Sequence, residues 1–151
     1  MRYLVLGYVG YSRGVPMVVL DISAFANAVQ SLHEALVAYK QGPNDFIRDA
    51  CIQRFEYTYD LAYRMLRRQV ERMVGGSDEV DQMTFPVLIR TGAEKGLLLN
   101  SWDVWKLHRD ARNITSHAYN ERKAQSVFED IPSFYEEAVY LRDQLKKYNG
   151  S

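Results

Sequence analysis

At 151 residues, with 47% hydrophobic and 25% charged side chains, the chain has the size and composition of one soluble globular domain. Its 19 basic and 19 acidic side chains give a formal net charge of zero, which argues against non-specific coating of nucleic acid or of an anionic membrane. The single cysteine, Cys51, excludes an internal disulfide and a cysteine-based zinc cage, and indicates a cytoplasmic protein.

The first sixteen residues differ in composition from the rest of the chain. Glycines and tyrosines surround a short apolar run at 3–6, which is far too short to span a membrane and has no signal-peptide cleavage site after it. We therefore expect residues 1–16 to be an extension without a function of its own. Residues 17–151 are expected to form a single helical domain that does not associate with a membrane.

Apolar residues at three- and four-residue spacing predict the first two helices. Asp21 or Ser23 can cap the first, which ends at the Gly-Pro turn within 41–44. Asn44 or Asp45 can cap the second. From 46 to 74 there is neither Gly nor Pro, so this second helix is the longest that the sequence predicts.

Four arginines lie on one side of the second predicted helix: Arg64, Arg67, Arg68 and Arg72. They could follow an RNA backbone, or they could form a solvated face with Asp60 and Glu71 as helical neighbours. We favour the solvated face, because exposed charge pairs are common and usually contribute little.

The following segment predicts a polar linker at 77–82 and a short helix at 87–95, introduced by Thr84-Phe85-Pro86 and closed by Gly96. Asn100 or Ser101 then caps a helix that carries Trp102 and Trp105. This tryptophan pair is better explained by the core or by a dimer interface than by base stacking.

A final helix carries apolar residues from Phe134 to Leu145, after a polar run at 120–123. Pro132 either begins this helix or kinks a longer segment that starts at Ser126. No stretch predicts a convincing strand. The expected fold class is all-α, an up-and-down four-helix bundle with short extra helices.

The densest group of chemically active side chains lies between Arg109 and Tyr119, at the expected C-terminal end of an amphipathic helix. Arginine is a permanent cation whose donors suit phosphate oxygens, and histidine exchanges a proton near neutral pH. The candidate catalytic residues are Arg112 and His117. Those in support are Arg109, Asn113 and Ser116.

The residues Arg112-Asn113-Ile114-Thr115-Ser116-His117 resemble the R-x(4–6)-H motif of HEPN domains. Tyr119 extends the motif to R-x4-H-x-Y, the form that resembles HEPN toxins paired with a minimal nucleotidyltransferase antitoxin. Residues 52–62 are similar to the second-helix signature of nucleotidyltransferase substrate-binding proteins, and the resemblance covers residues 19–148.

The resemblance implies a HEPN-like helical bundle that forms a homodimer, with two motifs facing each other across the interface. It implies metal-independent cleavage of an RNA substrate, and a nucleotidyltransferase partner that adenylylates the motif tyrosine, here Tyr119. An older naming of the same proteins treats them as non-catalytic substrate-binding partners of the nucleotidyltransferase. Both alternatives keep the same bundle and the same partner.

The residues fit metal-free RNA cleavage, in which the ribose 2′-hydroxyl attacks the neighbouring phosphate. His117 can move a proton, Arg112 can stabilise the charge that develops on the phosphorane, and Asn113 can bind a phosphate oxygen or hold the histidine tautomer. The motif supplies one histidine where an acid and a base are needed. A second subunit would supply the other, and His108 is a weaker candidate.

Helix geometry adds a constraint. At about 100° per residue, Arg112 and His117 lie about 140° apart on a regular helix. The helix therefore ends near Ser116 and His117 turns back, or the histidine works with the arginine of a second subunit.

Three of the site residues also have a purely structural explanation. His117 could cap the helix C-terminus, and Arg112 could pair with Asp110 or Glu121. Without the resemblance, Tyr119 would be a half-buried loop anchor. The three histidines, His33, His108 and His117, are scattered along the chain, so we expect neither a metal nor another cofactor.

Overall fold

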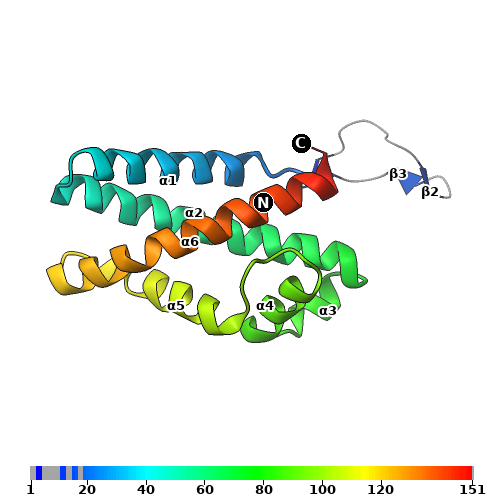
Figure 1. The fold of residues 1–151 in the computed structure, drawn as a ribbon. Coiled ribbons are helices and arrows are strands. Elements are labelled where there is room, and N and C mark those ends of the chain that lie inside the picture. Colours follow the sequence, from blue (N-terminus) through cyan, green and yellow to red (C-terminus); the bar gives the residue numbers. More distant parts are fainter. Residues whose placement is uncertain (1–2, 5–10, 13–14, 17–18, 151) are drawn as a thin grey trace.

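The computed structural model describes residues 3–4, 11–12, 15–16 and 19–150 of the chain. Four helices form the bundle (Figure 1): α1 (Ser23–Gln41), α2 (Asp45–Val74), α5 (Trp102–Asn113) and α6 (Glu121–Asn149). Between α2 and α5 lie the short helices α3 (Ser77–Asp81) and α4 (Phe85–Glu94), and the 3-10 helix η1 (Thr115–His117) precedes α6. The all-helical bundle predicted from the sequence is confirmed.

The two ends of α2 follow from their sequence. Asn44 is the N-cap, and its side-chain oxygen accepts a hydrogen bond from the Ile47 backbone N–H at 2.8 Å. At the other end Gly75 has φ 113°, a left-handed conformation that glycine adopts without strain. At the start of α1, Asp21 accepts the backbone N–H of Ser23, whereas Ser23 is itself the first helical residue.

The polar linker expected at 77–82 is wrong, because residues 77–81 form α3. Its one apolar residue, Val80, is fully buried, and Asp81 forms an ion pair with Arg67 of α2. The buried Val80 side chain and the Arg67–Asp81 ion pair therefore hold α3 in place. The helix is too short to show an apolar periodicity in the sequence.

The expected start of the last helix is also wrong. α6 begins at Glu121, because the Asn120 side chain accepts the backbone N–H groups of Arg122 and Lys123. The polar run at 120–123 is thus a helix cap and first turn. Pro132 lies inside α6 on its exposed face.

Two short antiparallel strand pairs precede the bundle, where the sequence predicted no strand. β1 (Tyr3–Leu4) pairs with β4 (Val19–Leu20), and β2 (Tyr11–Ser12) pairs with β3 (Val15–Pro16). The prediction that residues 1–16 have no function of their own falls mostly outside the described residues. Among the described helices, none is long and apolar enough to cross a membrane.

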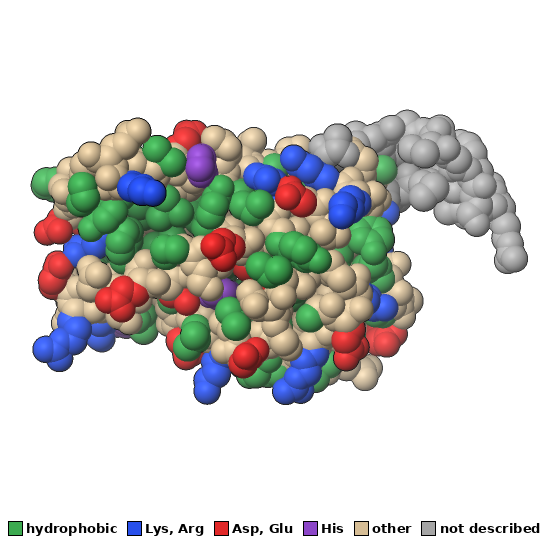
Figure 2. Space-filling view, viewed as in Figure 1, with side chains coloured by type: hydrophobic (Ala, Val, Ile, Leu, Met, Phe, Trp, Pro, Cys, Tyr) green, Lys and Arg blue, Asp and Glu red, His purple; other side chains and the backbone are tan. Residues whose placement is uncertain are grey.

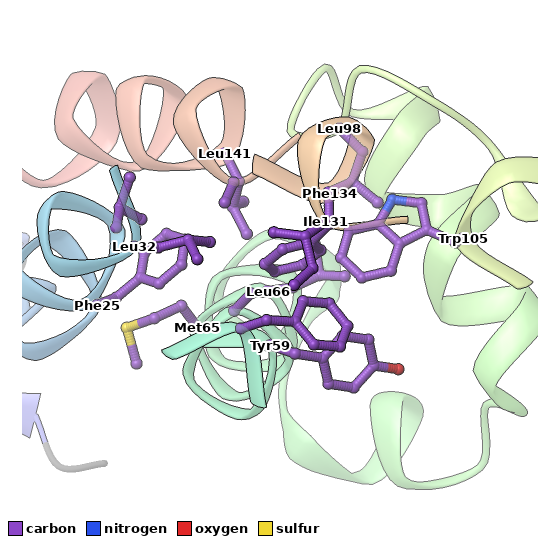
Figure 3. Close-up of a cluster of buried hydrophobic side chains, with 14 of the residues drawn as sticks. Phe25, Leu32, Tyr59, Met65, Leu66, Leu98, Trp105, Ile131, Phe134 and Leu141 are labelled. Carbon is purple, nitrogen blue, oxygen red and sulfur yellow. The ribbon is translucent and has the colours of Figure 1, made fainter. Parts of the chain in front are cut away.

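An aromatic cluster occupies the centre of the core, where α2, α5 and α6 meet (Figure 3). Trp105 and Phe134 pack edge to face, with ring centroids 6.1 Å apart and planes at 89°. Tyr59 of α2 contacts both rings. This confirms the core prediction for Trp105, and Trp102 is half-buried against Phe85 of α4.

A buried carboxylate fixes the start of α5. Glu137 of α6 accepts hydrogen bonds from the backbone N–H groups of Leu99 and Asn100 at 2.7 and 2.9 Å, and from the Trp105 indole at 2.9 Å. Burial raises the pKa of Glu137, and these three donors oppose that rise. Ser101 is the N-cap residue of α5, but its side chain makes no capping hydrogen bond. Instead, Glu137 of α6 accepts the backbone N–H groups of the two residues that precede Ser101.

The arginines of α2 take part in a charged surface rather than forming an uninterrupted cationic track. Arg67 pairs with Glu71 at 3.9 Å and with Asp81, and Arg72 donates to Asn149 at 2.5 Å. Figure 2 shows acidic and basic side chains interspersed on the visible face. The prediction of Glu71 as a neighbour is confirmed, whereas Asp60 pairs with a different helix.

Candidate functional site

The motif lies where α5 ends. The helix stops at Asn113, and Thr115–His117 form the separate 3-10 helix η1. Thr115 is buried, and its hydroxyl donates to the carbonyl oxygen of Arg112 at 2.9 Å. The expected break between Arg112 and His117 is therefore present, and it begins before Ser116.

Arg112 is held by a two-pronged ion pair with α2. Its Nε lies 2.9 Å from Oδ1 of Asp60, and its Nη2 lies 3.0 Å from Oδ2. Two charge-assisted hydrogen bonds of this kind fix both the position and the plane of a guanidinium group. The pairing raises the pKa of Arg112, and it replaces the expected partners Asp110 and Glu121.

Glu56 and Thr115 complete the network around this guanidinium. The Arg112 Nη1 lies 3.5 Å from Glu56 and 3.1 Å from the Thr115 hydroxyl, and that hydroxyl also contacts Glu56. Glu56 and Asp60 are four residues apart, so both carboxylates face the motif from one side of α2. Sequence reasoning missed both partners, although the second-helix stretch at 52–62 contains them.

His117 is exposed on η1, and within residues 19–150 its side chain makes no hydrogen bond or ion pair. The structure therefore places Arg112 and His117 at the same helix end without a direct hydrogen bond between them. The His117 ring centroid lies 6.3 Å from that of Tyr119.

Tyr119 is 87% exposed in the link between η1 and α6. The half-buried anchor that its position alone suggested is therefore wrong. Arg109, Asn113 and Ser116 are exposed as well, so five of the six proposed site residues face solvent around the end of α5.

Two hollows are lined by proposed site residues. One, of about 330 Å³, is lined by Asp49, Ile52, Gln53, Glu56, Thr115, Ala118 and Tyr119. The other, of about 210 Å³, is lined by Tyr59, Tyr63, Phe85, Arg109 and Asn113. Arg109, one turn before Asn113, has its guanidinium 5.2 Å from the Phe85 ring centroid.

His108 does not belong to this exposed site. It is fully buried, its Nδ1 lies 2.7 Å from Asp130, and its ring packs against Trp105 and Phe134. The weaker candidate for a second proton-transfer group is thus a core residue. Among the described residues, no group of three or more metal-binding side chains lies together.

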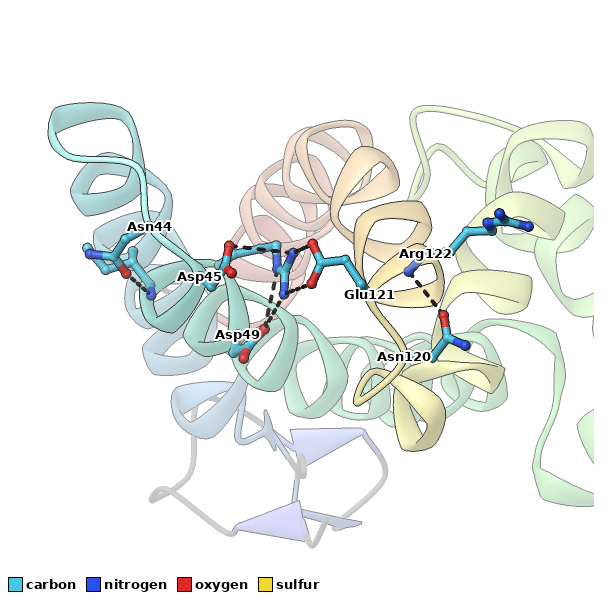
Figure 4. Close-up of polar contacts among 8 residues, drawn as sticks. Asn44, Asp45, Asp49, Asn120, Glu121 and Arg122 are labelled. Carbon is cyan, nitrogen blue, oxygen red and sulfur yellow. Dashed lines mark hydrogen bonds and ion pairs between the residues drawn. The ribbon is translucent and has the colours of Figure 1, made fainter.

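The buried side chain of Arg48 holds the segment that follows the motif in place (Figure 4). Arg48 of α2 donates to both carboxylate oxygens of Glu121, the first residue of α6, and to Asp49. These contacts raise the pKa of Arg48 and lower that of Glu121. Together with the Asp60 pair, they tie both sides of η1 to the same helix.

The family model described as nucleotidyltransferase substrate binding protein like matches residues 20–147. A Haemophilus influenzae protein described as probable ribonuclease HepT is 33% identical over 105 residues, which are 70% of this chain and 71% of that protein.

Two solved structures share the fold. A Haemophilus influenzae structure, described as revealing the fold of a substrate binding domain of a nucleotidyltransferase, has a TM-score of 0.76 and 28% identity, and covers 83% of this chain and 99% of its own. A Thermus thermophilus structure has a TM-score of 0.65 and 28% identity, and covers 81% and 98%. The chain belongs to the family of nucleotidyltransferase substrate-binding-like proteins, as its motifs indicated.

Proposed function

We propose that the chain is a metal-independent endoribonuclease, the toxin of a toxin–antitoxin pair, with Arg112 and His117 as its catalytic residues. The observation that supports this most is that His117, exposed and without a hydrogen bond or ion pair within residues 19–150, lies at the same helix end as an arginine whose orientation other side chains fix. A structural arginine needs no such neighbour, whereas phosphoryl transfer needs both a proton carrier and an oriented cation.

In the proposed reaction, His117 takes the proton of the ribose 2′-hydroxyl, whose oxygen attacks phosphorus and displaces the 5′-oxygen. The products are a 2′,3′-cyclic phosphate and a 5′-hydroxyl. The leaving oxygen needs a proton, which His117 of a second subunit would deliver in a two-fold homodimer. Sedimentation that shows a stable monomer at micromolar concentration would contradict this composite site.

The Arg112 network sets a condition on the reaction. Asp60 and Glu56 together carry two negative charges beside one guanidinium, so an RNA phosphate meets a site whose cation is already paired. The phosphate must displace at least one carboxylate contact, and Glu56 at 3.5 Å holds the weaker one. Asp60 then keeps the guanidinium oriented while the phosphate replaces Glu56.

The same pairing favours the second candidate function, a non-catalytic subunit that docks on a nucleotidyltransferase. In that case Arg112 is a structural link between α5 and α2. The similar Haemophilus influenzae structure, described as a substrate binding domain of a nucleotidyltransferase, supports this docking function. The similar Haemophilus influenzae protein described as probable ribonuclease HepT supports the ribonuclease function.

In both cases the proposed partner is a minimal nucleotidyltransferase. As the antitoxin, it would transfer AMP to the Tyr119 hydroxyl, which is highly exposed and lies beside one of the two hollows. The added phosphodiester is negatively charged and bulky, so it would oppose entry of an RNA phosphate by repulsion and by occlusion.

Expression of the protein without its partner separates the two candidates. Growth arrest is expected with the wild type and is expected to disappear with Arg112→Ala and His117→Ala. His33→Ala is the matched control, because His33 is an exposed histidine on α1 that contacts Tyr135 of α6. Arrest that persists in both motif variants at equal protein levels would contradict the proposed active site, and no arrest with the wild type would favour the docking subunit.

A further inference from the structure

The hollow at Arg109 and Asn113 has aromatic walls. Tyr63 of α2 and Phe85 of α4 line it, with ring centroids 5.4 Å apart and planes at 56°. Trp102 packs against Phe85 edge to face, with ring centroids 5.5 Å apart. The volume of about 210 Å³ lies below the range of about 300–1,000 Å³ that holds drug-sized ligands, and it suits one flat ring system.

A buried phenol with a free hydroxyl lines the same hollow. Tyr59 is 7% exposed, and its hydroxyl makes no hydrogen bond within residues 19–150. The oxygen reaches the surface, since it is not one of the fully buried polar atoms without a partner in that range. A ligand in the hollow can therefore bond it. Figure 3 shows the Tyr59 oxygen at the margin of the aromatic cluster, pointing away from it.

Two further polar groups stand at the rim. The Arg109 guanidinium lies over the Phe85 ring in a cation–π contact. This contact holds the guanidinium in place without using its N–H donors. Asn113 is exposed, and its amide, which both donates and accepts, has no partner in the described part of the chain. The hollow thus combines aromatic faces with one cation, one amide and the Tyr59 hydroxyl.

The position of the hollow ties it to the catalytic residues. Asn113 directly follows Arg112, and Tyr59 directly precedes Asp60, which holds Arg112. Whatever occupies the hollow is therefore close to the contact between α5 and α2 that holds Arg112.

We propose that this hollow is a nucleobase-binding subsite, which takes one unstacked base of single-stranded RNA beside the phosphate handled by Arg112 and His117. This inference rests on the proposed ribonuclease function. The base stacks against the aromatic walls, while Asn113, Arg109 and the Tyr59 hydroxyl bond its edge. Base-paired RNA is a poor ligand, because its bases are already stacked and their pairing edges are occupied.

The test couples removal of a base to removal of an aromatic wall. RNA oligonucleotides with 2′-O-methyl riboses cannot be cleaved by attack of the 2′-hydroxyl, and each carries a single abasic position. Their affinities are measured for the wild type, Tyr63→Leu, Asn113→Leu and a matched control, Tyr57→Leu. Tyr57 lies on the same helix but bonds Ser31 of α1. Circular dichroism checks that every variant folds.

For the wild type, we expect one abasic position to weaken binding by about ten-fold, the scale of one stacked base. That penalty should shrink in Tyr63→Leu and Asn113→Leu and persist in Tyr57→Leu, as in a double-mutant cycle. Equal penalties in all four proteins would overturn the nucleobase subsite but would not contradict the proposed ribonuclease function. A wild type that binds none of the oligonucleotides, and cleaves no RNA, would contradict the ribonuclease function and the subsite together.

Discussion

Arg112 on α5 and Asp60 on α2 form an ion pair through two parallel hydrogen bonds of 2.9 and 3.0 Å, although 52 residues separate them in the sequence. The pair sets the plane of the guanidinium from outside the motif. Asp60 is thus a positioning residue, which acts on the proposed chemistry only through Arg112.

Asp60→Asn tests this role. The amide keeps the shape of the carboxylate but cannot accept both Arg112 donors, and the local charge becomes less negative. We expect a loss of about 1 kcal/mol in the free energy of unfolding, after allowance for solvent screening of a half-exposed pair. RNA binding should tighten while kcat falls. The control is Asp143→Asn, which alters an exposed pair with Arg142 and should change neither RNA binding nor kcat. If RNA binding and kcat both fell in Asp60→Asn, a positioning role would be contradicted.

The Arg48–Glu121 pair predicts a pH dependence of stability. Arg48 lowers the pKa of Glu121 in the folded state below its ordinary value of 4.5, so the stabilising contribution is present above pH 4.5 and is lost as the pH falls through the lowered pKa. Glu121→Gln should be less stable than the wild type in urea at pH 7, with the difference disappearing in strong acid. Glu129→Gln, an exposed glutamate on the same helix, serves as the control. A difference that is constant across pH would show that the charge is unimportant.

Glu137→Gln should destabilise the protein by about 1–3 kcal/mol, the cost of leaving a buried donor without an acceptor. The carboxylate accepts three hydrogen bonds, whereas the amide presents a single oxygen to them. Thermal unfolding followed by tryptophan fluorescence measures the change, because Trp105 is one of the three donors. An unchanged midpoint would mean that the loop at 97–100 does not depend on Glu137.

Tyr119 is the predicted target of the nucleotidyltransferase. Incubation of the pair with ATP and Mg²⁺ should add the mass of one AMP to the wild type and nothing to Tyr119→Phe. The variant should keep its ribonuclease activity and escape silencing by modification. A gain that persists in Tyr119→Phe would place the modification elsewhere, and no gain in the wild type would leave inhibition by docking alone.

The long helices were predictable because their apolar spacing and their caps are local. The motif at 112–119 was also visible, since its residues are neighbours in sequence. The partners of Arg112 were not, because Glu56 and Asp60 approach it only after α2 packs against α5. Glu137 was hidden for the same reason, as it bonds donors 32 to 38 residues away.

Local signals were misread at two places. The polar run at 120–123 contains no apolar residue and was separated from the last helix, whereas Asn120 caps that helix there. The prediction of His108 as a weaker candidate for a second proton carrier is wrong, because its spacing from Trp105 and Ala111 places all three on the buried face of α5.

Metal-free RNA cleavage is the activity proposed for Arg112 and His117. Its most direct test is incubation of purified protein with a single-stranded RNA in excess chelator, with the product ends identified by mass spectrometry. We expect cleavage by the wild type and by His33→Ala with a 2′,3′-cyclic phosphate end, and a loss of at least about 100-fold in both Arg112→Ala and His117→Ala. Cleavage that stops on addition of chelator, or that survives in His117→Ala, would contradict it.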